Sequence, residues 1–313
     1  MFVEKFTYLG CDGRTNIAGY YYKTNKTPEK GLVYFAHGVT EYAQRHESLF
    51  EALNDAGYSV LANDHMGHGD SIHEYKTFFN SRGGVSGWDC ACRDAYMCVY
   101  YGKKVFDISK SLPVYGIGFS LGSFVVRTLA IRTPDLFTGL VLVGTGYQSL
   151  IKTSLGTLVA TLEGEKYGYK NETDMISKLT FDEYNKHFSG KTRVDWLCLN
   201  LEERDKYLND ERCGKAFTAG LFKDLLFGIE YTCNRQNMKQ MNTGLPILLL
   251  SGSRDAVGDF GKGVKTLHQK LSKLGYSSEY IIYNMMRHDI LHETGVEKVH
   301  NDIITFLDKI SIT

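Results

Sequence analysis

Hydrophobic runs and amphipathic stretches alternate along this chain. "GLVYFAHG" at residues 31–38 is a continuous apolar run that ends in glycine, which is typical of a strand buried on both faces. Residues 58–64, 112–120, 136–146, 245–255 and 277–285 predict further strands. The stretches between them place apolar residues at helical spacing, as in residues 46–57 with Leu49, Phe50 and Leu53. Strands that alternate with helices predict a parallel sheet covered by helices on both faces.

Two regions depart from this alternation. "FVEKFTYLG" and "NIAGYYYKT", separated by "CDGRT", predict a β-hairpin near the N-terminus. Residues 147–243 contain no comparable strand run but hold helix-like segments and many aromatic residues. We interpret residues 147–243 as an inserted helical cap, and residues 1–146 and 244–313 as the core. Ligands of such sheets bind at the carboxyl ends of the strands, so we expect the insertion to lie there.

The segment "YGIGFSLGSF" contains a candidate nucleophile, Ser120, with a glycine two residues away on each side. Glycine weakens both strands and helices, so Gly118 and Gly122 need a steric reason. A buried strand enters this segment and a helix leaves it, and so sharp a reversal would bring side chains at these positions into collision. The pattern predicts an exposed Ser120 hydroxyl, with the Leu121 N–H at the helix N-terminus as an oxyanion donor. A serine in a purely structural turn is the alternative.

A serine nucleophile requires a base, and the base requires an acid that orients it. Asp255 directly follows a predicted strand, and His288 lies between the last strand and the last helix, in the expected order of serine, acid and histidine. The weaker alternatives in the same loops are Asp259 for the acid and His292 for the base, whereas Asp289 is expected to stabilise its loop.

The loop after the strand at residues 31–36 is expected to supply the second oxyanion donor. His37 and Gly38 end that strand at the same edge of the sheet, which makes the backbone N–H of Val39 the candidate. Glu41 and Arg45 could pair to brace this loop, and a plain surface ion pair is the alternative.

Taken together, these blocks resemble the α/β-hydrolase superfamily, and within it the bacterial lysophospholipase and monoacylglycerol-lipase-like serine hydrolases. The matching blocks run from about residue 30 to the C-terminus and are "AHGVTEYAQRH", "NDHMGHGDS", "GIGFSLGS", "DWLCLN…CGKAFTAG", "LLLSGSRDAVG…GKGV" and "RHDILHE". The resemblance implies an α/β-hydrolase fold with a mostly parallel, eight-stranded sheet. It also implies a catalytic triad of Ser120, Asp255 and His288, with the amides of Val39 and Leu121 as the oxyanion hole.

The chain departs from the pattern of that family at three positions. Phe119 and Tyr42 stand where the family usually has histidine, and Ala256 replaces a proline that is common in the acid loop. None of these supplies a catalytic atom, but the first two lie beside the nucleophile and bear on substrate preference.

The expected function is hydrolysis of a carboxylic ester through an acyl-enzyme, as in a lysophospholipase or a monoacylglycerol-lipase-like esterase. The substrate would be a small-molecule or single-chain lipid ester, with no cofactor. A serine aminopeptidase or amidase on the same scaffold is one alternative, and a catalytically inactive ligand-binding scaffold is another. His65 and His68 in "DHMGHGDS" are spaced like a metal pair, but the glycines make this segment a loop, so no metal site is expected.

Composition restricts the partners and the compartment. Lys and Arg together number 36, as do Asp and Glu, so nothing favours nucleic acid as a partner. No apolar run approaches the roughly 18 residues that span a bilayer, and the N-terminus lacks the apolar core of a secretory signal. Seven scattered cysteines predict reduced thiols and a cytoplasmic protein. The oligomeric state is left open.

The insertion contains two further features that leave alternatives open. Residues 217–231 carry apolar side chains at helical spacing, which predicts a helix packed on the core or, alternatively, a wall of an acyl-chain pocket exposed enough to contact lipid aggregates. Trp196 is a candidate for the mouth of that pocket.

Overall fold

The computed structural model describes residues 2–72, 86–188 and 192–311, and in this part of the chain eight strands form one sheet. Their order across the sheet is β1-β2-β4-β3-β5-β6-β7-β8. The strands are β1 (Val3–Leu9), β2 (Asn16–Tyr22), β3 (Gly31–Ala36), β4 (Tyr58–Asn63), β5 (Val114–Phe119), β6 (Gly139–Val143), β7 (Ile247–Gly252) and β8 (Ser278–Tyr283). β1 and β2 pair antiparallel as the predicted hairpin, β2 pairs antiparallel with β4, and all other pairs are parallel. The predicted mostly parallel, eight-stranded sheet is therefore confirmed.

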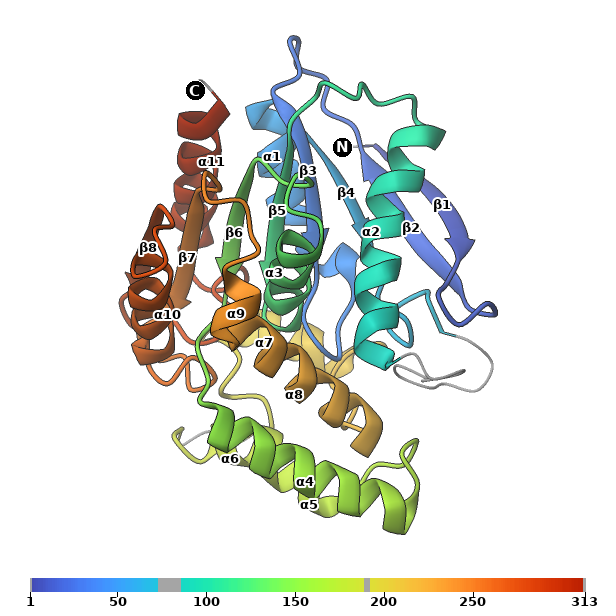
Figure 1. Ribbon diagram of the computed structural model, residues 1–313, viewed down its shortest axis with the longest axis vertical. Helices are drawn as coiled ribbons and strands as arrows, with labels where there is room; N and C mark the ends of the chain where they lie inside the picture. Colours follow the sequence, from blue (N-terminus) through green and yellow to red (C-terminus); the bar gives the residue numbers. More distant parts are fainter. Residues whose placement is uncertain (1, 73–85, 189–191, 312–313) are drawn as a thin grey trace.

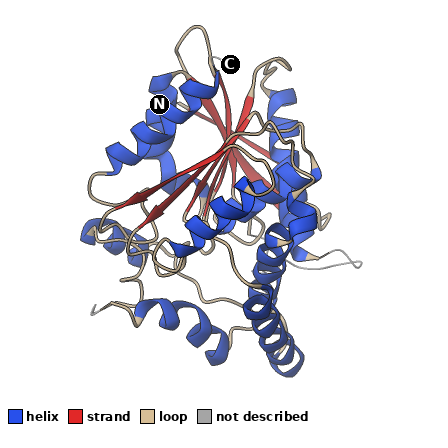
Figure 2. Ribbon diagram, turned by 60° about the vertical axis from the view of Figure 1, so that its left-hand side comes forward, coloured by secondary structure: helices blue, strands red, loops and turns tan. Residues whose placement is uncertain are grey.

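Helices cover both faces of the twisted sheet (Figure 2). One face carries α1 (Glu47–Ala56) and α11 (Val296–Ser311), and the other carries α2 (Gly87–Val105), α3 (Leu121–Arg132) and α10 (Lys262–Ser272). The central strands contribute to both cores, because Val33 and Phe35 face one layer while Leu32 and Tyr34 face the other. This explains why these strands read as continuous apolar runs instead of alternating ones.

The insertion consists of helices and connecting loops between β6 and β7. Its α-helices are α4 (Leu150–Tyr167), α5 (Asp174–Ser177), α6 (Glu183–Asn185), α7 (Leu201–Asn209), α8 (Ala219–Cys233) and α9 (Arg235–Met238). They lie beyond the carboxyl ends of the parallel strands, with α4 outermost (Figure 1). α8 packs against α2 and α3 of the core and against α4, and buries Leu221, Phe222 and Leu226. For these three side chains the predicted packing on the core is confirmed.

Glycines allow α3 to start in close contact with two strands. A Cβ atom at Gly118 would lie 2.3 Å from the carbonyl oxygen of Gly122, and one at Gly122 would lie 2.0 Å from the carbonyl oxygen of Ala36. Both contacts are far shorter than atoms tolerate, and both involve backbone. The steric reason predicted for the two glycines is therefore present, and it brings the ends of β3 and β5 together at the start of α3.

The described ranges contain no helix that is both long and apolar enough to cross a bilayer. All seven cysteines are free, and six of them are buried.

Candidate active site

Ser120 occupies the turn between β5 and α3. Its backbone has φ of 50° and ψ of −117°, a conformation that costs a non-glycine residue energy and is characteristic of a nucleophile at such a turn. Its N–H donates to the carbonyl of Val143 at 2.9 Å, which ties the turn to β6. The side chain is partly exposed, and its Oγ lies 2.9 Å from Nε2 of His288.

His288 is buried and lies between Ser120 and Asp255. Its Nδ1 lies 2.9 Å from Oδ1 of Asp255. A carboxylate accepts, so Nδ1 carries the proton and Nε2 is left to accept the hydroxyl of Ser120. Burial lowers the pKa of His288, but the nearby carboxylates of Asp255, Asp289 and Glu41 outweigh it, so the pKa lies above its usual value.

Asp255 is fully buried and its carboxylate is held by three further donors. Oδ1 accepts the N–H groups of Val257 at 2.9 Å and Gly258 at 3.1 Å, and Oδ2 accepts the hydroxyl of Ser251 at 3.2 Å. The alternative acid, Asp259, is exposed on the same loop. The structure thus brings Ser120, His288 and Asp255 together in the predicted order.

The two predicted oxyanion donors belong to the adjoining ends of α3 and β3. Leu121 is the first residue of α3, where helix N–H groups have no partner within the helix. Nδ1 of His37 donates to the carbonyl of Gly38 at 2.6 Å. This carbonyl and the N–H of Val39 belong to the same planar peptide, so the imidazole fixes the direction of that N–H. On the far side of Val39, the hydroxyl of Tyr207 donates to the carbonyl of Thr40 at 3.1 Å.

Of the two histidines spaced like a metal pair, His65 bonds to His37 at the end of β3, and His68 bonds to the carbonyl of Met66. His37 Nε2 accepts the backbone N–H of His65 at 2.9 Å, and the two rings lie 4.2 Å apart. Burial is the main cause that lowers the pKa of His65 to about 3 and that of His68 to about 4, so these rings are neutral. Among the residues that the structure describes, no three His, Cys, Asp or Glu side chains are grouped to hold a metal ion.

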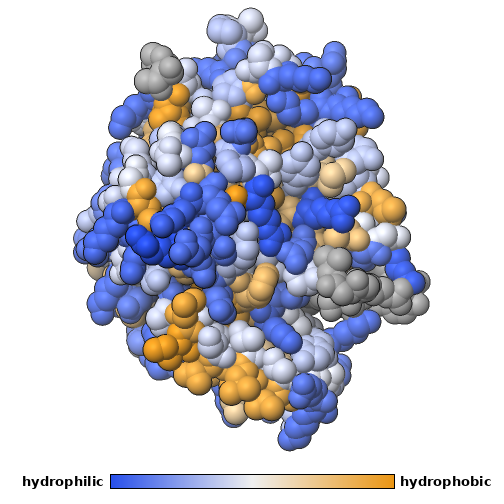
Figure 3. Space-filling view, in the orientation of Figure 1, coloured by the Kyte–Doolittle hydropathy of each residue, from blue (hydrophilic) through white to orange (hydrophobic). Residues whose placement is uncertain are grey.

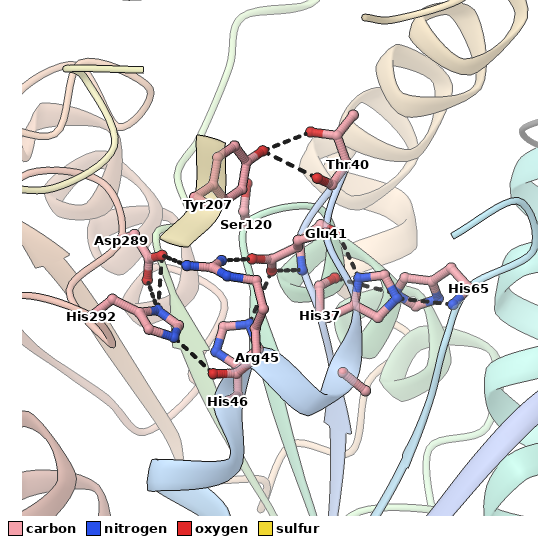
Figure 4. Close-up of polar contacts among 12 residues, drawn as sticks. His37, Thr40, Glu41, Arg45, His46, His65, Ser120, Tyr207, Asp289 and His292 are labelled. Carbon is pink, nitrogen blue, oxygen red and sulfur yellow. Dashed lines mark hydrogen bonds and ion pairs between the residues drawn. The ribbon is translucent and has the colours of Figure 1, made fainter. Parts of the chain in front are cut away.

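The loop after β3 that carries Val39 is called the oxyanion loop below. Glu41 anchors it through a buried ion-pair network (Figure 4). Its Oε1 accepts the N–H of Gly38 at 2.6 Å and Nε2–H of His46 at 3.0 Å, while Oε2 pairs with Arg45. The predicted pairing of Glu41 with Arg45 is confirmed, and it is buried instead of lying on the surface. Burial raises the pKa of Glu41, but His46 and Arg45 outweigh it and hold this pKa well below its usual range.

The same network reaches the loop that carries His288. Arg45 also donates to Oδ2 of Asp289 at 3.4 Å, and Nδ1 of His292 donates to Asp289 at 2.9 Å. Nε2 of His292 faces the carbonyl oxygen of Arg45 at 2.9 Å. The ring of His292 therefore joins Asp289 to the backbone of Arg45. Asp289 is thus held by Arg45 and His292, in agreement with its predicted role in stabilising its loop.

Sequence reasoning missed how directly the insertion contributes to the site. Tyr207 of α7 places its ring 4.9 Å from the guanidinium of Arg45 as well as bonding to Thr40. Trp196, expected at a pocket mouth, is instead buried, with its ring 5.3 Å from that of His288. The block "DWLCLN" was the one sequence signal for the segment that contains Trp196. Contacts between distant loops could not be predicted, because they leave no periodic pattern in a single sequence.

A family model described as "Hydrolase_4: Serine aminopeptidase, S33" matches residues 27–295. The chain belongs to this family of α/β-hydrolases. Monoglyceride lipase of Mus musculus is 25% identical over 286 residues, which cover 88% of this chain and 84% of that protein. Monoglyceride lipase of Homo sapiens is 33% identical over 123 residues, which cover 39% of this chain and 37% of that protein.

Solved structures share the whole fold. A carboxyl esterase from Bacillus coagulans superposes with a TM-score of 0.89 at 21% identity, covering 99% of both chains. A soluble variant of monoglyceride lipase from Saccharomyces cerevisiae superposes with a TM-score of 0.74 at 17% identity, covering 98% of this chain and 94% of that one. The family and these relatives support the predicted class, a serine ester hydrolase similar to monoacylglycerol lipases.

Proposed function

We propose that this protein hydrolyses carboxylic esters with Ser120 as nucleophile, His288 as general base and acid, and Asp255 as the group that orients His288. The observation that carries the proposal is the row of hydrogen bonds from Ser120 Oγ through the His288 ring to Asp255, each 2.9 Å long. The strained turn at Ser120 and the adjacent amides of Val39 and Leu121 support it.

The reaction starts when His288 Nε2 takes the hydroxyl proton of Ser120 and Oγ attacks the ester carbonyl carbon. The carbonyl oxygen becomes an oxyanion, which the N–H groups of Val39 and Leu121 stabilise, while Asp255 stabilises the imidazolium. The bond to the alcohol then breaks, and His288 protonates the departing oxygen. Water, deprotonated by His288, attacks the acyl group, and the acid leaves as Ser120 regains its proton.

We further propose that residues 147–243 act as a cap and that the substrate is a single-chain lipid ester. α4 supports this, because Ile151, Leu155, Leu158 and Leu162 form an apolar row along one side of the helix, each more than half exposed. Hydrophobic side chains gather at this end of the molecule (Figure 3). Such a face suits contact with lipid aggregates, from which a single-chain ester would enter the cap. The names of the monoglyceride lipase relatives point to the same substrate class.

Labelling with a fluorophosphonate tests the nucleophile. The wild-type protein should be labelled, Ser120→Ala should not, and Ser109→Ala, which changes an exposed serine on another loop, should behave as wild type. Absence of labelling in the folded wild-type protein would instead favour the inactive, ligand-binding scaffold.

A series of 4-nitrophenyl esters of increasing acyl length tests the substrate class. Each methylene buried in an apolar pocket contributes about 0.8 kcal/mol, so kcat/KM should rise about fourfold per methylene. A maximum at acetate or butyrate would contradict the lipid ester and leave the hydrolase intact. Faster turnover of aminoacyl 4-nitroanilides than of any ester would favour the aminopeptidase that the family description names.

A further inference from the structure

One segment of the insertion, residues 195–199, begins in a turn and lies alongside the loop that carries His288. Three hydrogen bonds join the two: the Arg287 guanidinium to the carbonyl of Asp195, the Asp289 N–H to the carbonyl of Leu197 at 2.7 Å, and the Leu199 N–H to the carboxylate of Glu293 at 2.9 Å. The first two bonds join the residues on either side of Trp196 to the residues on either side of His288. The position of Trp196 is therefore fixed by the loop whose histidine it contacts.

The indole of Trp196 packs directly on the imidazole of His288. The ring centroids lie 5.3 Å apart with 39° between the planes, and Trp196 is 6% exposed. Tyr184 also contacts the indole, with ring centroids 5.5 Å apart. Phe119 also contacts the imidazole at 5.2 Å, and at Gly144 a Cβ atom would lie only 3.0 Å from Cε1 of His288. The imidazole is thus in contact with the rings of Trp196 and Phe119 and lies close to the backbone at Gly144.

We propose that Trp196 is a positioning residue for His288, an inference that rests on the proposed function. The bond from Ser120 to Nε2 is lost each time the proton moves, and the ring torsion of histidine is soft. The contact with Trp196 persists through that step and keeps Nε2 directed at the reacting oxygen. The electron-rich face of an indole also stabilises a nearby cation, so it favours the imidazolium that forms during attack.

Two substitutions separate this role from plain packing. Trp196→Leu keeps the site apolar but offers no aromatic face. We expect kcat for a short, soluble ester to fall about tenfold, because the cation–π contact is lost and the His288 ring is held less firmly. KM should be little affected. Trp196→Phe should recover most of the loss. A Leu variant with wild-type kcat, or one that changes KM alone, would overturn the proposal, and the latter would make Trp196 a wall of the substrate pocket.

Fluorescence tests the contact without any turnover, because the chain has only two tryptophans, Trp88 and Trp196. A protonated imidazole quenches an indole that it touches, so emission should drop as His288 gains a proton on acidification. The drop should vanish in Trp196→Phe and in His288→Gln. It should persist in the matched variant Trp88→Phe, which removes the other tryptophan, buried against α8, and keeps Trp196.

The two assays also separate this proposal from the proposed function. If a fluorophosphonate labels Ser120 but no pH-dependent drop assigned to His288 is seen, the role of Trp196 is wrong and the hydrolase stands. If the drop is seen but labelling fails, the contact exists and the hydrolytic function is wrong.

Discussion

Gly122→Ala is the substitution for which the structure gives the clearest expectation. A methyl group at this position would lie 2.0 Å from the Ala36 carbonyl oxygen and 2.7 Å from that of His37, whereas real contacts of this kind stay above 3.0 Å. The start of α3 and the end of β3 would therefore have to separate by about 1 Å. Both acceptors are backbone atoms next to a buried strand, so no side-chain rotation can relieve the clash.

This separation would displace two parts of the proposed catalytic site. Ser120 and Leu121 move with α3, whereas Val39 moves with the end of β3, so both the nucleophile and the two oxyanion donors lose alignment. Overpacking of this kind costs about 1–3 kcal/mol of stability, and a displacement of about 1 Å costs about 10²-fold in rate. We therefore expect a folded protein with kcat/KM reduced about a hundredfold.

The assay is kcat/KM for a short 4-nitrophenyl ester, with circular dichroism and thermal melting as checks on folding. Gly244→Ala is the matched control, since its new methyl group would meet nothing closer than Asn242 Oδ1 at 3.4 Å, and it should keep wild-type activity. A folded Gly122→Ala protein with wild-type kcat/KM would show that the close approach of α3 to β3 does not set the active-site geometry.

Three further outcomes follow from the charges and surfaces described above. Glu41→Gln should lower the free energy of unfolding at pH 7 by about 3 kcal/mol in urea titrations, since it breaks a buried ion pair. Because the pKa of Glu41 is lowered by folding, its carboxylate stabilises above about pH 4 and loses this effect in stronger acid, so the difference should shrink there; a constant difference would contradict the assignment. The acid limb of kcat/KM should lie above about pH 6.5, because the pKa of His288 is raised. It should move to lower pH in Asp289→Asn, and an unmoved limb would remove Asp289 from the groups that tune His288. Replacing Leu155 and Leu158 by serine should cut hydrolysis of micellar monoacylglycerol at least about tenfold while leaving a monomeric ester unaffected; equal losses on both would place α4 in folding or catalysis instead.

The sheet and its helices could be predicted from the sequence because each has its own period. Continuous apolar runs marked β3 to β7, and the apolar stripe with Val299, Ile303 and Phe306 marked α11. The candidate catalytic residues could be located because the fold places such residues at fixed points after particular strands. Ser120, Asp255 and His288 each follow the end of a strand, so the order of elements located them without any knowledge of distances.

Helix periodicity alone could not show which apolar stripe is covered. α8 and α4 both carry apolar rows, but α8 packs between the core and α4, whereas the row on α4 faces outward. The contacts of Trp196 and Tyr207 were equally hidden, because they join side chains to loops roughly a hundred residues or more away in the chain. Charge complementarity suggested the Glu41–Arg45 pair, four residues apart, but not the link from Arg45 to Asp289.

These contacts divide the insertion into two parts with different relations to the catalytic loops. Tyr207 of α7 bonds to the oxyanion loop at Thr40, and Leu197 accepts the N–H of Asp289 next to His288. α8 fills the groove beside α2 so closely that a Cβ atom at Gly228 would lie 2.3 Å from the ring of Trp88. Displacing any of these segments would disturb the oxyanion loop, the loop of His288 or the core. α4 packs mainly on α8 and exposes its apolar row, so it is the part of the insertion that we propose to contact a lipid surface, because moving it would not displace the segments bonded to the catalytic loops.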